Sequence, residues 1–147
     1  MFAAVIPKWI GQLMKSETVH FNGDGKTSRN FCFVANAVQA NLLAETTELE
    51  AAVREVYNVA VGDRTSLNEL YELLRSRPPS SVTHLIDATP IRNGFCDGAL
   101  RHSLADIGKS RQLLGFDPSR RVGDGLRVAT DRYIGNSPTS TSPTPAH

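Results

Sequence analysis

The sequence is poor in cysteine and nearly balanced in charge, and each shortage excludes a class of protein. Its 147 residues include two cysteines, Cys32 and Cys96, which form neither a CxxC motif nor a Cys/His cluster. A disulfide framework and a zinc site are therefore not predicted. The 16 basic and 15 acidic residues give a net charge of +1, which provides no overall field to attract nucleic acid or anionic lipid. Any anion site must be local.

Long apolar runs are also lacking. Residues 1–14 mix apolar side chains with proline, lysine and glutamine, whereas a signal peptide or a membrane span needs an unbroken apolar segment. We therefore expect a cytoplasmic protein that binds neither membrane nor nucleic acid. Residues 135–147 are rich in Ser, Thr and Pro without apolar periodicity, so they cannot offset the entropy lost on ordering. This predicts one domain over residues 1–134 and a disordered tail over residues 135–147.

Apolar periodicity and capping signals predict short helices. Residues 5–14 carry apolar side chains at spacings of three and four, which marks one buried helix face. Ser66 and Glu69 have the spacing of a capping box before a leucine stripe, which predicts a helix there. Further helices are expected over residues 36–43 with Asn36 as N-cap, over residues 107–114 between an Asp106 cap and Gly115, and over residues 122–133.

Short strands are predicted between these helices. β-Branched and aromatic residues favour strands at residues 19–21, 31–34, 56–61 and 82–86. The Asn-Gly-Asp-Gly sequence at residues 22–25 predicts a turn after the first of them. Because helices and strands interleave along the chain, the sequence predicts an α/β protein.

Two local patterns imitate phosphate-binding or catalytic motifs. The Gly-Lys-Thr sequence at residues 25–27 resembles the end of a P-loop, but the first glycine of that motif would fall on His20. The motif also needs a helix next, where a loop and a strand are expected. Residues 102–106 contain the His, Ser and Asp of a catalytic triad. Adjacent residues of an extended segment point apart, so Asp106 is expected as a helix cap instead.

Two side chains allow a binding role. Arg29 follows the glycine turn, where its planar guanidinium can meet a pair of phosphate oxygens, although a solvated arginine is the more common outcome. Trp9, the only tryptophan, lies on the apolar face of the first predicted helix. It is a core residue unless that helix lines a cleft, where an indole can stack on a flat ring. Both alternatives stay open on these residues alone.

Several strings, taken together and in order, resemble one family. They are AAVIPKW (residues 3–9), NGDG (22–25), TSR (27–29), VYNVA (56–60), GDRT (62–65), RHSLADI (101–107) and LLGF (113–116). The family they resemble is the UDP-N-acetylglucosamine and UDP-glucose 4-epimerases. These are NAD-dependent epimerase/dehydratase proteins of the extended short-chain dehydrogenase/reductase group. The resemblance covers about residues 2–134 of the chain.

The resemblance implies an α/β fold that corresponds to the C-terminal substrate-binding subdomain of that group, with short strands and interleaved helices and without the Rossmann domain. In the family, the Rossmann domain holds NAD and supplies the base of a Tyr-x-x-x-Lys motif. Neither that motif nor a strand-coupled glycine fingerprint for a dinucleotide occurs in this sequence. We therefore expect no catalytic residue, no metal ligand and no bound NAD on this chain alone.

The resemblance also implies contacts to a UDP-sugar. The uracil pocket is expected at Ala4, Val5 and Trp9, the uridine and ribose path at His20, Phe21 and Asn22, and the pyrophosphate partner at Arg29. Family members carry an Arg-x-Gly-Asp pattern that adds a phosphate arginine and a ribose carboxylate. This sequence has Cys96 and Ala99 at those positions. The loss of two charged contacts is expected to weaken UDP-sugar binding.

These expectations define a function and an alternative. The chain is expected to be the UDP-sugar-binding portion of an NAD-dependent UDP-N-acetylglucosamine/UDP-glucose 4-epimerase, inactive alone and partnered by the missing Rossmann half in cis or in trans. The alternative is a non-catalytic binding or interaction remnant of the epimerase fold whose nucleotide site has decayed. Apolar surface that normally packs on the Rossmann half would be exposed, so self-association is expected.

Overall fold

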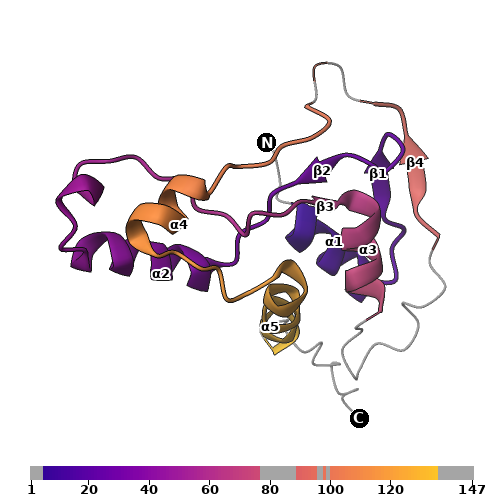
Figure 1. Cartoon of the computed structure of the whole chain (residues 1–147). Helices are drawn as coiled ribbons and strands as arrows, with labels where there is room; N and C mark the ends of the chain where they lie inside the picture. Colours follow the sequence, from indigo (N-terminus) through magenta and orange to yellow (C-terminus); the bar gives the residue numbers. More distant parts are fainter. Residues whose placement is uncertain (1–4, 77–88, 96–97, 99, 136–147) are drawn as a thin grey trace, which may run out of the picture.

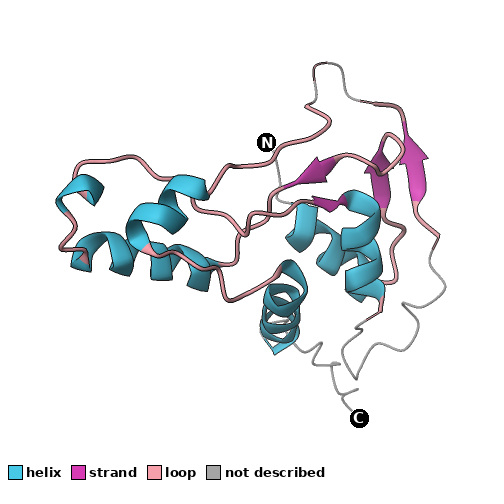
Figure 2. Ribbon diagram, viewed as in Figure 1, coloured by secondary structure: helices cyan, strands magenta, loops and turns pink. Residues whose placement is uncertain are grey.

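The computed structural model describes residues 5–76, 89–95, 98 and 100–135, as short helices and strands that alternate along the chain (Figure 1 and Figure 2). The helices are α1 (Val5–Met14), α2 (Val34–Thr46), α3 (Leu67–Arg75), α4 (Gly108–Leu114) and α5 (Val122–Gly135), with a 3-10 turn η1 (Glu50–Ala52). The strands are β1 (His20–Asn22), β2 (Ser28–Arg29), β3 (Thr65–Ser66) and β4 (Ile91–Asn93). The predicted α/β class is thus confirmed. The strand predicted at residues 82–86 and residues 136–147 of the predicted tail lie outside the described residues.

Two small sheets join segments that are far apart in the sequence. β1 and β4 pair in parallel, with Phe21 opposite Arg92 and Asn22 opposite Asn93. β2 and β3 pair antiparallel, with Arg29 opposite Thr65. Figure 1 shows all four strands on one side of the molecule beside α1 and α3, while α2, η1 and α4 form an arm that extends away from them.

The buried apolar residues form two cores. The apolar face predicted for residues 5–14 is confirmed, because Trp9, Ile10 and Leu13 are buried. The larger core joins α1, β1, α3 and α5, and it contains Trp9, Ile10, Leu13, Val19, Phe21, Leu70, Tyr71, Leu74 and Leu126. The smaller core lies in the arm and contains Ala40, Ala52, Leu114 and Phe116.

The capping box acts as predicted at α3, whereas the N-cap position of α4 is Ile107 and not the predicted Asp106. The backbone N–H of Glu69 donates to Ser66 Oγ over 3.2 Å, and Glu69 Oε2 accepts from the backbone N–H of Ser66 over 2.7 Å. At α4, Asp106 Oδ1 accepts from the backbone N–H of Gly108 over 2.8 Å. Gly115 ends that helix in the left-handed conformation. Both helices therefore begin close to where the sequence indicates.

The prediction for the start of α2 is wrong. Residues 31–33 form no strand, and Val34, which is 67% exposed, begins the helix. Asn36 is not an N-cap but lies fully buried inside the helix. Its Nδ2 donates to the carbonyl of Arg120 over 2.7 Å, and its Oδ1 accepts from the backbone N–H of Arg120 over 3.1 Å. The prediction fails because Asn36 is held by this tertiary contact, which no local sequence pattern reveals.

The strand predicted at residues 56–61 is also absent. This segment pairs with no other segment among those that the structure describes, and Val56 is 86% exposed. β-Branched residues form a strand only where a neighbouring strand completes the hydrogen bonds.

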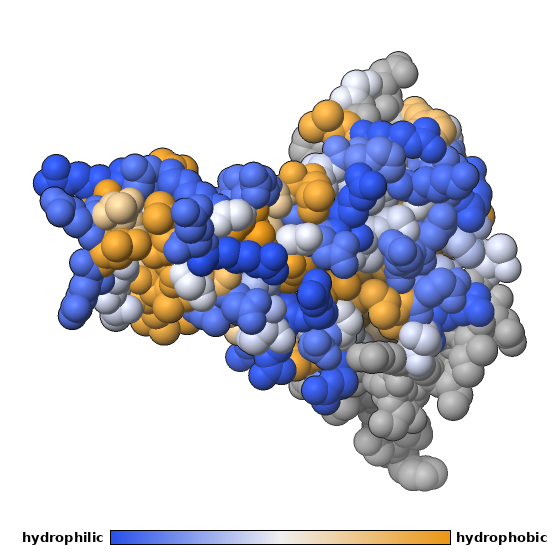
Figure 3. Space-filling view, viewed as in Figure 1, coloured by the Kyte–Doolittle hydropathy of each residue, from blue (hydrophilic) through white to orange (hydrophobic). Residues whose placement is uncertain are grey.

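α2, which precedes this segment, exposes Val34, Val38 and Leu42 at intervals of one helical turn. Apolar surface is therefore visible on the arm (Figure 3).

Candidate functional site

The turn between β1 and β2 approaches two side chains closely. Gly23 and Gly25 have left-handed φ angles of 80° and 73°, which residues with a Cβ disfavour. A Cβ on Gly23 would lie 2.3 Å from the Phe95 ring, and one on Gly25 would lie 2.2 Å from Asn68 Oδ1. Glycine at both positions lets these neighbours pack directly against the turn.

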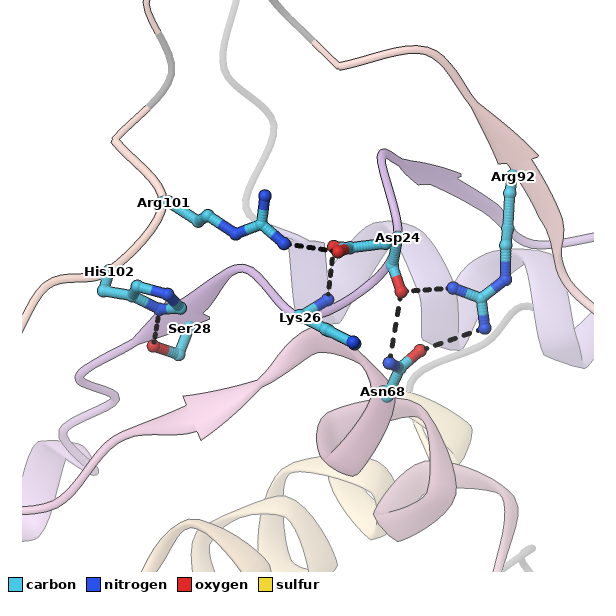
Figure 4. A network of polar contacts seen from close by, with 7 residues as sticks. All are labelled: Asp24, Lys26, Ser28, Asn68, Arg92, Arg101 and His102. Atoms are coloured by element: carbon cyan, nitrogen blue, oxygen red, sulfur yellow. Dashed lines mark hydrogen bonds and ion pairs between the residues drawn. The ribbon is translucent and has the colours of Figure 1, made fainter.

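Asp24, between the two glycines, is the centre of a polar network (Figure 4). Its carboxylate accepts from the backbone N–H of Lys26 over 2.9 Å and forms an ion pair with Arg101. Its backbone carbonyl accepts from the guanidinium of Arg92 and, over 3.3 Å, from the amide of Asn68. Arg92 also donates to Asn68 Oδ1 over 3.4 Å. Strand β4, helix α3 and the segment before α4 thus meet at one residue.

A second polar pair lies where β2 meets residues 101–103. Ser28 forms an isolated parallel bridge with His102, in which the Ser28 N–H donates to the Arg101 carbonyl over 2.9 Å. Ser28 Oγ and His102 Nδ1 are 2.9 Å apart. His102 therefore contacts Ser28 through its ring, and Ser28 is only 5% exposed. The pair stabilises the contact between the two segments and presents no accessible nucleophile.

Arg29 lies directly beside this bridge and is half-buried. Its Nη1 donates to the Ser28 carbonyl over 2.9 Å and to the Arg101 carbonyl over 3.5 Å. These two acceptors restrict one nitrogen of the guanidinium. The cationic side chains at or next to the turn are Lys26, Arg29, Arg92 and Arg101. They outnumber the single carboxylate of the network, so the turn is locally positive on a chain of net charge +1.

The carboxyl group of Asp24 is stabilised in its ionised form. The hydrogen bond from the Lys26 backbone is the largest cause that lowers the pKa of Asp24, and the charge of Arg101 lowers this pKa further. Both interactions favour the carboxylate over the protonated acid. Asp24 therefore remains an anion opposite Arg101 at neutral pH.

Only some of the residues that are predicted to contact uridine are exposed. Trp9 and Phe21 are 2% and 1% exposed, and their rings stack with centroids 4.7 Å apart. His20 and Asn22 flank Phe21 on β1 and are exposed, while Val5 is half-buried at the start of α1. The assignment of these residues to uracil and ribose stays a prediction. Outside the described residues lie the positions Ala4, Cys96 and Ala99.

Sequence reasoning missed Asn68, Arg92 and Arg101 as members of this network. Arg101 stands in one of the strings that carry the family resemblance, but nothing near it in the sequence indicates that it faces the glycine turn. Arg92 lies in β4, a strand that the sequence does not predict, and it reaches the turn because β4 pairs with β1. The missing information is a tertiary pairing, so no local signal identifies these residues.

The glycine turn does not fit a dinucleotide. The pyrophosphate of NAD binds where a glycine-rich turn leads from a strand into the N-terminus of a helix. Here the turn leads from β1 into β2, which also excludes a P-loop at residues 25–27.

Within the described ranges, no cluster of three or more His, Cys, Asp or Glu side chains suits a metal ion. No helix in those ranges has the length and apolar character needed to cross a bilayer.

A separate apolar groove of about 410 Å³ lies between the start of α2 and the end of α5. It contains none of the predicted site residues, and it adjoins the apolar surface of α2. Its lining consists of Phe33, Val34, Val128, Ala129, Arg132 and Tyr133.

Comparison with known proteins identifies similar sequences. The NAD dependent epimerase/dehydratase family matches residues 3–60. A protein of Methanocaldococcus jannaschii, provisionally named a UDP-glucose 4-epimerase, is 32% identical over 137 residues, which are 93% of this chain and 41% of the relative. A dTDP-glucose 4,6-dehydratase of Haemophilus influenzae is 29% identical over 143 residues, which are 92% of this chain and 41% of the relative.

Solved structures have the same fold over a similar extent. The UDP-glucose 4-epimerase of Thermotoga maritima with UDP-glucose matches with a TM-score of 0.77 and 28% identity, over 90% of this chain and 40% of that chain. The UDP-N-acetylglucosamine 4-epimerase of Methanobrevibacter ruminantium M1, in complex with UDP-N-acetylmuramic acid, matches with a TM-score of 0.78 and 28% identity, over 92% of this chain and 41% of that chain. The chain spans about two fifths of the length of these relatives, consistent with a C-terminal portion of their fold. The chain is thus similar to the NAD dependent epimerase/dehydratase family over residues 3–60, and it corresponds to a part of the longer proteins that it resembles.

Proposed function

We propose that this chain is the UDP-sugar-binding portion of an NAD-dependent UDP-N-acetylglucosamine/UDP-glucose 4-epimerase and does not catalyse epimerisation alone. The observation that carries this proposal is the position of Arg29, whose guanidinium is restricted by two carbonyls next to a locally positive glycine turn. An arginine held at one nitrogen can still present its planar fork to phosphate oxygens. UDP-sugars carry a diphosphate, and the two solved structures above contain UDP-glucose and UDP-N-acetylmuramic acid.

The chain lacks the groups that would perform the chemistry. The residues four positions after its three tyrosines are valine, arginine and serine, so no Tyr-x-x-x-Lys pair can supply a base. The glycine turn leads into a strand and does not suit a dinucleotide. NAD and the base therefore come from a Rossmann half, either in the same longer protein or as a separate chain.

The arm supports a contact with such a half. α2 exposes Val34, Val38 and Leu42 in one apolar stripe. Such a stripe can pack on the helices or the sheet face of another domain. A Rossmann half offers these surfaces, because it is a mostly parallel sheet covered by helices.

Calorimetric titration with UDP-glucose, UDP and uridine tests the binding part of the proposal. We expect UDP-glucose and UDP to bind and uridine to bind much more weakly. Arg29→Gln should raise the Kd for UDP about tenfold or more, because a charge-assisted hydrogen bond contributes roughly 1.5–3 kcal/mol. The matched control is Arg75→Gln, which removes an arginine of α3 whose ion pair with Glu72 lies at the surface. It should leave the Kd unchanged.

Two results would contradict parts of the proposed function. A folded chain that binds neither UDP-glucose nor UDP at millimolar concentration would contradict the proposal and favour the non-catalytic remnant. The replacement of two expected charged ligands by Cys96 and Ala99 supports that alternative. Conversion of UDP-glucose to UDP-galactose by the purified chain with added NAD would contradict the statement that it is inactive alone.

A further inference from the structure

We infer that Arg101 is a second guanidinium of the diphosphate site and that the carboxylate of Asp24 competes with the ligand for it. This inference rests on the proposed function and deepens it. It assigns a phosphate-binding role to a residue outside the set that the family resemblance implies. The observations that carry it are the direction of the side chains at the Ser28–His102 bridge, the ion pair of Arg101 and the exposure of both ionic partners.

The bridge directs Arg29 and Arg101 to the same side. Successive side chains of an extended segment point to opposite faces. Ser28 and His102 share one face, because Ser28 Oγ and His102 Nδ1 are 2.9 Å apart. Their neighbours Arg29 and Arg101 therefore leave from the other face. The contact of Arg29 Nη1 with the carbonyl of Arg101, at 3.5 Å, agrees with this arrangement.

Arg101 is oriented and yet accessible. Its guanidinium lies over the Phe95 ring at 5.1 Å from the centroid, and it forms an ion pair with Asp24. The side chains of Arg101 and Asp24 are 49% and 33% exposed, so a dissolved anion can reach both. Arg92 differs, because its guanidinium already donates to the Asp24 carbonyl and to Asn68. Arg101 is therefore the better candidate for a second phosphate contact.

The carboxylate of Asp24 is a chemical analogue of the phosphate that would replace it. A carboxylate is planar and a phosphate is tetrahedral, but each presents a pair of oxygens that can accept from the fork of a guanidinium. Asp24 does not depend on Arg101 for its place in the turn, because its Oδ1 accepts from the Lys26 backbone over 2.9 Å. A diphosphate carries more negative charge than one carboxylate and can displace Oδ2 from Arg101 while the turn stays intact.

Titration with inorganic pyrophosphate and with UDP tests the exchange, with uridine as the ligand that lacks phosphate. Arg101→Gln should raise the Kd for both anions about tenfold or more, and Arg101→Lys should restore part of the affinity. Asp24→Asn should lower the Kd severalfold, because it removes the competing charge. In the Arg101→Gln background, Asp24→Asn should have a much smaller effect. Arg75→Gln is the control for loss of one positive charge.

The outcomes separate this inference from the proposed function. If Arg29→Gln weakens UDP binding and Arg101→Gln does not, the inference fails and the proposed function stands. If Asp24→Asn weakens binding while its thermal midpoint matches that of the wild type, Asp24 is not a competitor and the inference also fails. If neither the wild type nor Asp24→Asn binds UDP or pyrophosphate, both proposals fail. If Arg101→Gln raises the Kd for uridine as much as it raises the Kd for UDP, Arg101 has a structural role only and the inference fails.

Discussion

The indole of Trp9 stacks on the ring of Phe21, with centroids 4.7 Å apart and an interplanar angle of 17°. Tyr71 meets both rings edge-on, at 6.0 Å from Trp9 and 5.4 Å from Phe21. These three rings join α1, β1 and α3. The strand that leads into the glycine turn therefore rests on an aromatic core.

Trp9→Ala should strongly destabilise the fold. Removing a buried tryptophan leaves a cavity, and the expected loss is about 3–5 kcal/mol in the free energy of unfolding. Urea denaturation followed by circular dichroism measures it. The control is Val56→Ala at an 86% exposed position, which should change stability by less than about 0.5 kcal/mol. Equal effects of the two substitutions would contradict a core role for Trp9.

Gly25→Ala should destabilise the turn, whereas Gly11→Ala should not. Gly25 has a φ of 73° and a Cβ position 2.2 Å from Asn68 Oδ1, while nothing lies within 4 Å of a Cβ on Gly11. Gly11 is inside α1, where alanine is favoured over glycine by up to about 1 kcal/mol. Thermal unfolding should therefore shift the two midpoints in opposite directions. A neutral Gly25→Ala would argue against the close contact.

Glu69 should make stability depend on acid pH. The hydrogen bond from the Ser66 backbone is the largest cause that lowers the pKa of Glu69 below its ordinary value of 4.5. Because the pKa is lower in the folded state, the stabilisation is present above about pH 4.5 and disappears as the pH falls through the folded-state value. Glu69→Gln should reduce the loss of thermal midpoint below about pH 5. Asp131→Asn on α5 is the control for removing one carboxylate, and an identical pH profile for both variants would oppose the capping role.

Val38→Lys should reduce self-association of the chain. Val38 is 50% exposed in the apolar stripe of α2, where a charge disfavours contact between apolar surfaces. Sedimentation at increasing concentration gives the association constant. Asn41→Lys adds the same charge at another exposed position of α2 and should have less effect. A monodisperse wild-type monomer at high concentration would contradict the expected self-association.

The sequence predictions are correct where the signal lies within one short segment, and they fail where the structure depends on residues far apart in the sequence. α1 and α3 are predictable because their apolar stripes and the Ser66–Glu69 box lie within single segments. The start of α2 is not, because buried Asn36 is bonded to Arg120, which is 84 residues away. Residues 56–61 have strand composition, but composition cannot supply the neighbouring strand that a strand requires.

The candidate site likewise combines a residue that the sequence suggests with contacts that only the tertiary structure reveals. Arg29 is a candidate from the resemblance, since it stands in a short string next to the glycine turn, and its phosphate-binding role stays a prediction. The contacts that surround it come from tertiary structure, because Arg101 contacts Asp24 from a segment that is bridged to β2 at Ser28 and His102. Trp9 shows an ambiguity that the sequence leaves open, since its position on a helix face allows a core or a cleft, and its assignment to a uracil pocket stays a prediction. The structure has it in the core.

The site is closed by contacts between distant parts of the chain, and this has a consequence for folding. The bonds from Asp24 to Arg92 and Arg101, and from Ser28 to His102, span 68, 77 and 74 residues. Contacts of such long range form slowly, because the chain must first close a large loop at a cost in entropy. The helices can therefore form before the candidate site is complete, and a nascent chain acquires this arrangement only after residues 101 and 102 have been synthesised.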